Sequence, residues 1–300
     1  LFHFLMPGFL GEATQFRRVY RTPIEKQGNT QRRESLERRI RPFLLRRTKE
    51  QVARELPAKT EIIHPVELGG PQREFYETVR VAMDERVQQE LENRGAAQSQ
   101  IIVLDALLKL RQVCCDPRLV KMDIVQPVVE SAKLAALMEM LDALLSEGRK
   151  VLLFSQFTEM LELIEAELRK TGAKWVKLTG ATRDREAPIN AFQSGEVPLF
   201  LISLKAGGTG LNLTAADTVI HYDPWWNPAV ERQATDRAHR IGQDKPVFVY
   251  KLIVAGSVEE KIAQLQAEKA ALAEAILGEP GRGGGALTAE DIAALFEPLR

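Results

Sequence analysis

The carboxyl-terminal half of the chain alternates short apolar segments with longer amphipathic ones, and few folds accommodate that pattern. Five segments are predicted strands: VLLF at 151–154, then 175–179, 198–203, 218–223 and 247–254. Predicted helices precede, separate or follow them, at 131–145, 158–170, 183–193, 228–240 and 257–277. Strands that alternate with helices over about 145 residues predict a parallel sheet with helices on both faces, an α/β fold.

The region before this alternation is predicted to be mainly helical. Helices are expected at 34–45, 72–93 and 101–113, with a strand at 60–68. One narrow apolar stripe runs along the second helix, formed by Phe75, Val79, Met83 and Val87. GRGGG at 281–285 is expected to be a flexible joint before a short helix at 288–296. Four apolar residues would dock that helix: Leu287, Ile292, Leu295 and Phe296.

Charge is distributed unevenly, although 41 basic and 41 acidic residues give a formal net charge of zero. The first 60 residues carry 14 Lys or Arg against 6 Asp or Glu, and the rest of the chain has the opposite excess. The arginines concentrate between Arg32 and Arg47. This cluster either contacts a polyanion such as nucleic acid or forms a solvated helix face paired with Glu34, Glu37 and Glu50.

Composition excludes several classes of protein. Hydrophobic content of 45% and charged content of 27% are typical of a globular chain. No apolar run approaches the roughly 20 residues that span a bilayer, and residues 1–10 lack the flanks of a signal peptide. Cys114 and Cys115 are adjacent, and the four histidines are scattered. A cytoplasmic protein without a disulfide or metal site is therefore expected.

The stretch PAVERQATDRAHRIGQ, at 228–243, carries the clearest candidate chemistry. On a helix, Gln233, Arg237 and Arg240 fall on one face. Planar guanidinium groups match phosphate oxygens and can neutralise charge on a transferred phosphoryl group. The alternative is a surface face whose arginines form salt bridges with Glu231 and Asp236.

The stretch SLKAGGTGLNLT, at 203–214, follows an apolar strand, where ligand-binding loops lie in doubly wound sheets. Gly207, Gly208 and Gly210 would let backbone amides approach an anion closely. A tight turn would explain the glycines, but it does not explain the polar residues among them: Ser203, Lys205, Thr209 and Asn212. No P-loop is present, because the chain contains no Gly-Lys dipeptide.

Two further stretches also follow predicted strands. HYDPWWNP, at 221–228, contains Trp225 and Trp226, which are seldom left exposed without a role. At least one of them is interpreted as a hydrophobic plug between loops. Ser155–Thr158 follows VLLF in the equivalent position and includes Gln156 and Phe157.

Together these stretches resemble one family. VLLFSQFTEM, KLTGAT, LFLISLKAGGTGLNLTAADTVIHYDPWWNP and ERQATDRAHRIGQ resemble, in order and spacing, the second RecA-like lobe of Swi/Snf-type DNA translocases. These are helicase-like ATPases of superfamily two. Upstream, RPFLLRRTKEQVARELPAKTE is similar to the end of the family's first lobe, and LLKLRQVCCDP to its helical insertion. LTAEDIAALF is similar to the carboxyl end of bacterial members.

The resemblance implies a division of the chain into four parts. Residues 1–70 would be the tail of the first RecA-like lobe with a basic helical protrusion. Residues 71–128 would be a helical insertion and linker, and residues 129–277 the second RecA-like lobe, or helicase C-terminal domain. Residues 278–300 would be the flexible joint and the short carboxyl-terminal helix.

The resemblance also implies roles for individual residues. Arg237 and Arg240 would act with Gln233 on the γ-phosphate as arginine fingers, and Trp225 and Trp226 would couple the nucleotide cleft to the DNA groove. The implied nucleotide-cleft residues are Gly208, Gly210 and Asn212. The implied DNA-binding residues are Ser203, Lys205, Thr209, Gln156, Phe157, Gly180 and Thr182.

As a member of this family, the chain would be the second motor lobe of an ATP-dependent translocase on double-stranded DNA. ATP with Mg²⁺ would be bound mainly by the first lobe of the same polypeptide, so this chain alone would be inactive. A DNA-bound protein that the motor displaces is a further candidate partner, and no membrane is implied. In a prokaryote such a protein would be nucleoid-associated. Two alternatives remain: a strand-separating DNA or RNA helicase, and an interaction scaffold without ATPase activity.

Overall fold

The computed structural model describes residues 2–27, 29–43, 56–94, 96–121, 130–206, 210–225, 227–277 and 289–299. Several residues singled out from the sequence lie outside these ranges: Arg46, Arg47, Glu50, Gly207, Gly208, Thr209, Trp226 and Leu287. The chain forms two compact units, Leu1–Glu55 and Leu56–Arg300.

The first unit is helical. It contains α1 (Phe2–Leu5), α2 (Ala13–Phe16), a π-helical turn (Arg17–Arg21), α3 (Thr22–Gln27) and α4 (Thr30–Ile40). Asn29 begins α4 as its N-cap, because its side chain accepts a hydrogen bond from the Arg32 amide at 3.0 Å. The helix ends before Pro42, which lies in a 3-10 turn. No residue of α4 is buried, so its arginines lie at the surface of this unit.

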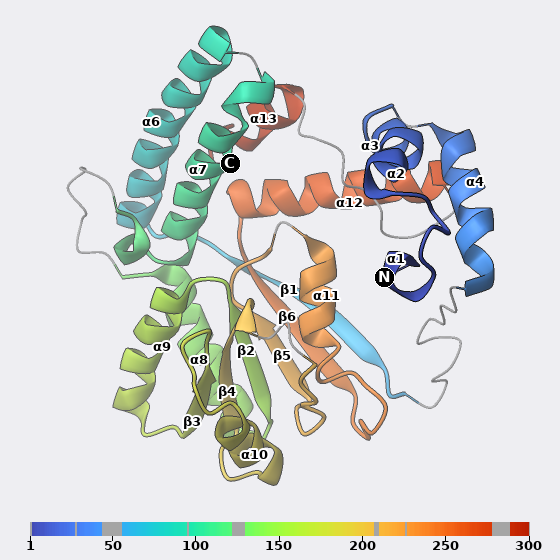
Figure 1. Cartoon of the computed structure of the whole chain (residues 1–300). Coiled ribbons are helices and arrows are strands. Elements are labelled where there is room, and N and C mark those ends of the chain that lie inside the picture. The colour runs from blue at the N-terminus through green and yellow to red at the C-terminus, as the bar shows by residue number, and fades with distance from the viewer. Residues whose placement is uncertain are drawn as a thin grey trace. The chain divides into compact units, whose positions relative to one another are not determined.

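The second unit contains a six-stranded parallel sheet in the order β1-β6-β5-β2-β4-β3, which confirms the predicted α/β fold (Figure 1). The strands are β1 (Lys59–Val66), β2 (Val151–Ser155), β3 (Trp175–Leu178), β4 (Leu199–Ser203), β5 (Thr218–His221) and β6 (Val247–Val254). Every residue of β2, β4 and β5 is buried, as the apolar runs VLLF of β2 and LFLI of β4 predict for those two strands.

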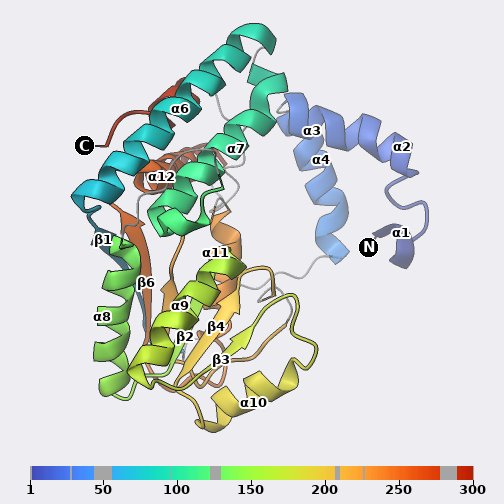
Figure 2. The same cartoon turned by 90° about the vertical axis from the view of Figure 1, so that its left-hand side faces the viewer.

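Helices cover both faces of this sheet (Figure 2). They are α8 (Ala132–Ser146), α9 (Thr158–Thr171), α10 (Glu186–Ser194) and α11 (Pro228–Thr235). Val151 and Leu153 of β2 pack with α8 and α9, whereas Leu152 and Phe154 pack with α10 and α11. Each large side chain buried in this way contributes about 1.5–3 kcal/mol to stability.

A second apolar core joins the two helices between β1 and β2 with the two helices after β6. It contains residues of α6 (Gly70–Arg94), α7 (Ala96–Cys115), α12 (Val258–Leu277) and α13 (Ala289–Leu295). All four residues of the predicted α6 stripe are buried in it. The predicted docking of the last helix is confirmed for Ile292, Leu295 and Phe296. No helix in the described part of the chain is both long and apolar enough to cross a membrane.

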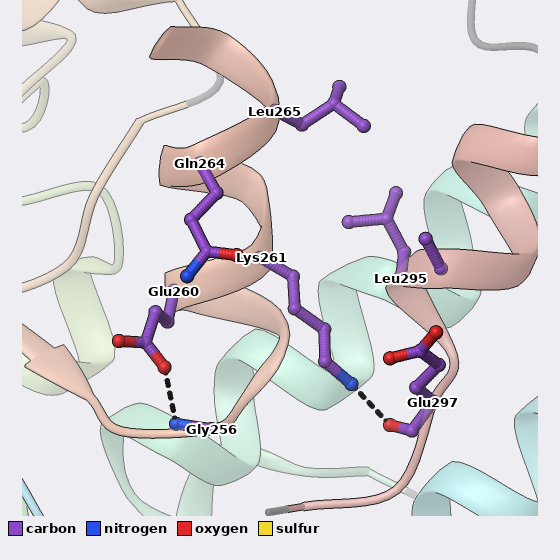
Figure 3. A pocket seen from close by; sticks show the side chains of 8 residues that line it. Gly256, Glu260, Lys261, Gln264, Leu265, Leu295 and Glu297 are labelled. Atoms are coloured by element: carbon purple, nitrogen blue, oxygen red, sulfur yellow. Dashed lines mark hydrogen bonds between the residues drawn. The ribbon is translucent and has the colours of Figure 1, made fainter. Parts of the chain in front are cut away.

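The contact between α12 and α13 also contains a cavity of about 230 Å³ (Figure 3). Glu260 accepts a hydrogen bond from the Gly256 amide at 2.7 Å, which satisfies a donor at the start of α12. Lys261 donates to the carbonyl of Glu297 and so fixes the chain after α13. This cavity is lined by none of the candidate site residues of the sequence analysis.

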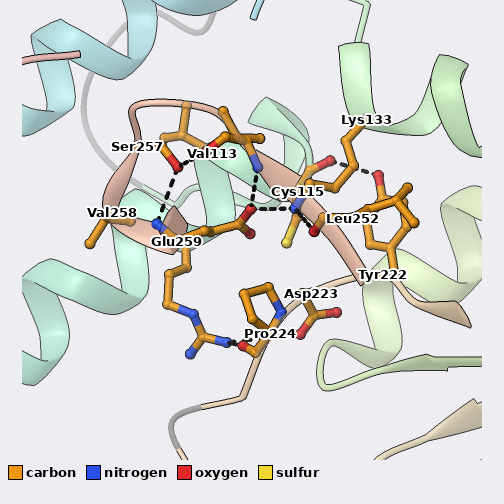
Figure 4. A network of polar contacts seen from close by, with 12 residues as sticks. Val113, Cys115, Lys133, Tyr222, Asp223, Pro224, Leu252, Ser257, Val258 and Glu259 are labelled. Carbon is orange, nitrogen blue, oxygen red and sulfur yellow. Dashed lines mark hydrogen bonds and ion pairs between the residues drawn. The ribbon is translucent and has the colours of Figure 1, made fainter. Parts of the chain in front are cut away.

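A buried ion pair connects α8 with the start of α12 (Figure 4). Lys133 Nζ lies 2.5 Å from Glu259 Oε2, and neither side chain is exposed. Lys133 also donates to the carbonyl of Leu252 at 3.2 Å, and Glu259 accepts from the Val254 amide at 3.0 Å. Burial lowers the pKa of Lys133, but the charge and hydrogen bond of Glu259, together with the nearby Cys114 and Cys115, hold the pKa above its ordinary value.

Strand β1 belongs to the same sheet as the strands of the carboxyl-terminal half. It pairs along its whole length with β6, from Lys59 beside Val247 to Val66 beside Val254. The second compact unit begins at Leu56 and includes α6 and α7 as well as the sheet. The loosely alternating sequence of this strand suits an edge position, where only part of each face is covered.

Candidate functional site

Three loops at the carboxyl edge of the sheet are joined by hydrogen bonds. The Leu204 amide, after β4, donates to the carbonyl of Ser155 at 2.9 Å. The Tyr222 amide, after β5, donates to the carbonyl of Phe154 at 3.0 Å. The loops after β2, β4 and β5 therefore meet at one edge, as the parallel topology requires.

Asp223 is the buried centre of this junction, and sequence reasoning missed it. Its carboxylate accepts a hydrogen bond from the Ser155 hydroxyl at 2.5 Å and from the Gln156 amide at 3.2 Å. Burial raises the pKa of Asp223, while the charge of Arg111 and the hydrogen bond from Ser155 act in the opposite direction. The carboxylate thus fixes the 155–157 loop against the loop after β5.

The predicted helix at 228–240 is wrong at its carboxyl end. Helix α11 begins at Pro228 but ends at Thr235, and turns follow. In a helix that reached Arg240, the Arg240 amide would donate to the carbonyl of Asp236, but it donates instead to the carbonyl of Ala238 at 3.1 Å. The Leu213 amide donates to the Arg237 carbonyl at 3.0 Å, and the Gln243 side chain donates to the Ala238 carbonyl at 3.1 Å. Hydrogen bonds from other parts of the chain therefore hold these turns in place.

Gln243 connects this turn with the segment after the glycine-rich loop. Besides Ala238, its amide nitrogen lies 3.1 Å from the Thr214 carbonyl and 2.7 Å from the Ala216 carbonyl. Gln243 is only 7% exposed. Gln243 is the last residue of the stretch at 228–243, and the sequence analysis assigns it no role.

Arg237 and Arg240 lie close together in the turn, although not on one helical face. Burial lowers the pKa of Arg237, and the positive charge of Arg240 lowers it further. Arg237 is 7% exposed, and within the described ranges its Nε has no hydrogen-bond partner. Arg240 and Gln233 are exposed. The turn therefore concentrates positive charge that the neighbouring protein groups leave partly unsatisfied.

The proposed salt bridge from these arginines to Glu231 is not formed. Glu231 Oε2 instead lies 3.2 Å from Lys251 Nζ, and its other oxygen accepts from the Trp225 amide at 2.6 Å. Lys251 also contacts Glu61 of β1 at 3.2 Å. Glu231 thus positions the loop after β5 and does not neutralise the arginine turn.

The described part of the glycine-rich loop lies next to the arginine turn. Gly210 and Asn212 are exposed, and Leu213 is the residue bonded to the Arg237 carbonyl. A side chain at Gly210 would meet no atom of the described protein within 4 Å. Packing within the described chain therefore does not explain the glycine.

The predicted DNA-binding residues differ in their surroundings. Lys205 and Gly180 are exposed. Ser203 is 3% exposed and accepts from the Ala206 amide at 3.4 Å, and Thr182 accepts from the Thr179 amide at 3.0 Å, so both hydroxyls hold local turns. Arg185, which precedes α10, donates to the Ala206 carbonyl at 2.7 Å.

Gln156 and Phe157 face a different part of the molecule. Both line a cavity of about 420 Å³ together with residues of α7, namely Asp105, Leu108, Lys109 and Gln112. Within the ranges that the structure describes, the side-chain nitrogen Nε2 of Gln156 is buried without a partner. The cavity places these two residues beside α7.

Trp225 is half-buried and packs against the apolar cluster beneath α10 and α11. Its amide donates to Glu231, and its carbonyl accepts from Gln266 of α12 at 3.2 Å. The hydrophobic plug expected of at least one tryptophan is thus supported for Trp225.

Sequence reasoning also missed Arg111. The residue lies on α7 and is 2% exposed, and it donates to the carbonyl of Pro224. Its neighbours on the buried face, Leu107, Leu110 and Cys114, are fully buried. A single charged residue in phase with an apolar stripe was the signal that could have found it.

A buried histidine gives this edge of the sheet a predicted pH dependence. His221 Nε2 lies 3.0 Å from Thr235 Oγ1, and burial lowers the pKa of His221 from 6.5 to about 4. The unfolded chain takes up this proton below about pH 6.5 and the folded chain does not. The contribution to stability is therefore present above pH 6.5 and is lost as pH falls towards 4, reaching about 3 kcal/mol.

This effect is measured as the difference in urea midpoint between pH 7 and pH 4.5. His221→Asn should reduce the loss of stability across this interval. Asp223, with a raised pKa, and Glu61, with a pKa of about 2, titrate in both proteins and do not enter the comparison. Equal pH slopes in the two proteins would contradict the assignment to His221.

Family models match both parts of the chain. The "Helicase conserved C-terminal domain" matches residues 132–242, and the "SNF2-related domain" matches residues 1–119. YwqA of Bacillus subtilis (strain 168), named for ATP-dependent helicase/translocase activity, is 39% identical over 285 residues. The match covers 92% of this chain but only 30% of that protein, so this chain spans less than a third of its relative's length.

Solved structures match at similar levels of identity. The Sulfolobus solfataricus SWI2/SNF2 ATPase core in complex with dsDNA is 33% identical, with a TM-score of 0.64 over 99% of this chain and 62% of that chain. The C-terminal domain of the S. solfataricus SWI2/SNF2 ATPase is 32% identical, with a TM-score of 0.62. That match covers 80% of this chain and 99% of that domain. The chain therefore belongs to the Swi/Snf-type ATPases of helicase superfamily two and contains their RecA-like carboxyl-terminal lobe.

Proposed function

We propose that this chain is the second motor lobe of an ATP-dependent translocase that moves on double-stranded DNA. The observation that carries the proposal is the arginine turn. Arg237 and Arg240 lie together beside the segment that follows the glycine-rich loop, and the carboxylate of Glu231 is engaged elsewhere. A buried guanidinium Nε without a described partner, with a second arginine beside it and an open glycine nearby, is suited to an anionic ligand.

The residues present fit the phosphate end of ATP. Arg237 offers a buried Nε without a described partner, and Gly210 leaves space for a close approach. Bound ATP would supply the phosphoryl group, and the role of the two arginines is to hold positive charge where negative charge develops. In this proposal Mg²⁺ is held mainly by groups of the first lobe.

The proposed DNA contacts lie in two loops of the same unit. Lys205 is exposed after β4, and Gly180 and Thr182 lie in the turn after β3. A lysine would contact phosphate, and backbone amides of turns can do the same without reading sequence. We propose duplex DNA, and not a separated strand, as the substrate. This choice is supported by a solved relative that matches 99% of this chain and is described in complex with dsDNA.

The first prediction concerns hydrolysis. This chain alone should hydrolyse ATP no faster than a buffer control, with or without duplex DNA, because it contains no P-loop lysine. The polypeptide that carries both lobes should show DNA-stimulated hydrolysis, measured as phosphate release. Rapid turnover by this chain alone, or no stimulation of the two-lobe protein by DNA, would argue against the proposed function.

The second prediction concerns DNA affinity. This chain should bind duplex DNA weakly and without base preference, and its affinity should fall steeply as salt increases. Lys205→Ala should weaken binding modestly and reduce the salt slope by about one. Fluorescence anisotropy at several salt concentrations measures both quantities. Glu196→Ala, a change at another exposed residue of this unit, serves as a control. Salt-independent binding would contradict the prediction.

A further inference from the structure

Arg111 is an unusual residue to bury in an apolar helix. It lies on α7 at 2% exposure, and its neighbours on that face belong to the core between α6 and α7. Within the described ranges, its Nε has no hydrogen-bond partner. An incompletely satisfied buried charge costs several kcal/mol, and an apolar side chain of similar volume is often as stable or more stable. Stability alone is therefore a poor reason for an arginine here.

The guanidinium group of Arg111 contacts one short loop, which follows β5. We name Asp223, Pro224 and Trp225 the 223–225 loop; Figure 4 shows the first two. Arg111 Nη2 donates to the carbonyl of Pro224 and lies 4.0 Å from Asp223 Oδ2. The end of α7 is also attached to the residue before this loop, because the Tyr222 hydroxyl donates to the Cys115 carbonyl at 2.8 Å.

The same loop is held by the elements that carry the candidate site. Asp223 accepts from Ser155 and Gln156 in the loop after β2. The amide of Trp225 donates at 2.6 Å to Glu231 of α11, the helix that leads into the arginine turn. The 223–225 loop is therefore the point where the helical insertion meets both α11 and the loop after β2.

We propose that Arg111 is a positioning residue of the motor, which holds the 223–225 loop so that α11 presents Arg237 and Arg240 in the productive position. The inference rests on the proposed function and deepens it. Arg111 acts through the backbone of Pro224 and the carboxylate of Asp223, and through Trp225 and Glu231 it reaches α11. It does not itself contact the nucleotide.

The main test is steady-state hydrolysis by the two-lobe protein, with duplex DNA saturating. Displacing catalytic groups by about 1 Å can cost up to about 100-fold in rate. Arg111→Ala should therefore lower kcat at least about tenfold while KM for ATP changes by less than about threefold. Arg111→Lys should restore part of kcat, because it keeps one charged donor but not the planar fork.

A matched control separates positioning from stability. Arg80 of α6 also donates to a backbone carbonyl, that of Phe296, at 2.9 Å, and its side chain is 11% exposed. It lies in the contact with α13 and touches no residue of the 223–225 loop in the described structure. Arg80→Ala should lower the melting temperature and leave kcat per folded molecule unchanged. All rates are measured below the melting temperature of each variant.

A second measurement, on this 300-residue chain, does not depend on hydrolysis. Trp175→Phe leaves Trp225 and Trp226 as the fluorescent residues, because the chain has three tryptophans. Adding Arg111→Ala should increase acrylamide quenching of the folded protein, and adding Arg80→Ala should not. A DNA-stimulated wild type with normal kcat in folded Arg111→Ala would overturn the inference alone. A wild type that DNA does not stimulate would overturn the proposed function, and unchanged quenching would overturn the loop contact itself.

Discussion

Arg240→Ala should reduce DNA-stimulated ATP hydrolysis by the two-lobe protein by about a thousandfold or more, which is the typical contribution of an arginine finger. The contribution belongs to the transition state, because negative charge develops on the transferred phosphoryl group there. Since Arg240 is exposed in the turn after α11, its removal should change the melting temperature little. Phosphate release gives the hydrolysis rate and thermal unfolding gives the melting temperature, both measured on the same preparation.

Two further variants sharpen this test. Arg240→Lys should rescue activity poorly, because an ammonium group cannot reproduce the planar fork. Arg237→Ala should also abolish stimulation, but Arg237 is buried, so some loss of stability should accompany it. If the arginines formed only a surface salt-bridge network, both alanine variants would retain turnover per folded molecule. Near-normal turnover in Arg240→Ala would refute the proposed role.

Lys133→Met should lower the free energy of unfolding by about 3–5 kcal/mol, the usual result of removing one partner from a buried ion pair. The reason is that Glu259 would remain in the core without its counter-ion. Because the pKa of Lys133 is raised, the stability from this pair is present at neutral pH and is lost only as pH rises above about 10.5. Urea unfolding at pH 7 measures the effect.

Two controls identify the buried charge as the cause. Lys133→Met combined with Glu259→Gln should lose less than Lys133→Met alone, because glutamine keeps an oxygen for the Val254 amide without the charge. Lys121→Met removes an exposed pair with Glu159, formed at 2.7 Å, and should cost less than about 1 kcal/mol. Equal losses from Lys121→Met and Lys133→Met would contradict the prediction.

Buried strands could be predicted from the sequence because a strand covered on both faces is an unbroken apolar run. VLLF and LFLIS are such runs, and both are central strands of the sheet. Strand β1 was recognised as a strand, but its sheet could not be predicted. Its partner strand, β6, lies far along the chain, and the local sequence of a strand does not specify which distant strand it pairs with.

The candidate site was less predictable because tertiary hydrogen bonds determine it. The helix predicted at 228–240 is too long, since nothing in its local sequence shows the turns after Thr235, which hydrogen bonds from Leu213 and Gln243 hold in place. The motif nevertheless contains the residues that meet in the turn. Asp223 and Arg111 were missed because their roles depend on which loops meet at the edge of the sheet.

The pairing of β1 with β6 has a consequence for how the chain folds while it is being synthesised. A ribosome makes β1 well before β6, with α6, α7 and four other strands of the sheet between them. During that interval β1 has no partner strand, and its unpaired backbone groups can pair with another chain. Because contacts between distant segments form slowly, completion of this sheet should be a late step in folding. The most vulnerable nascent chains are therefore those that stop short of Val247.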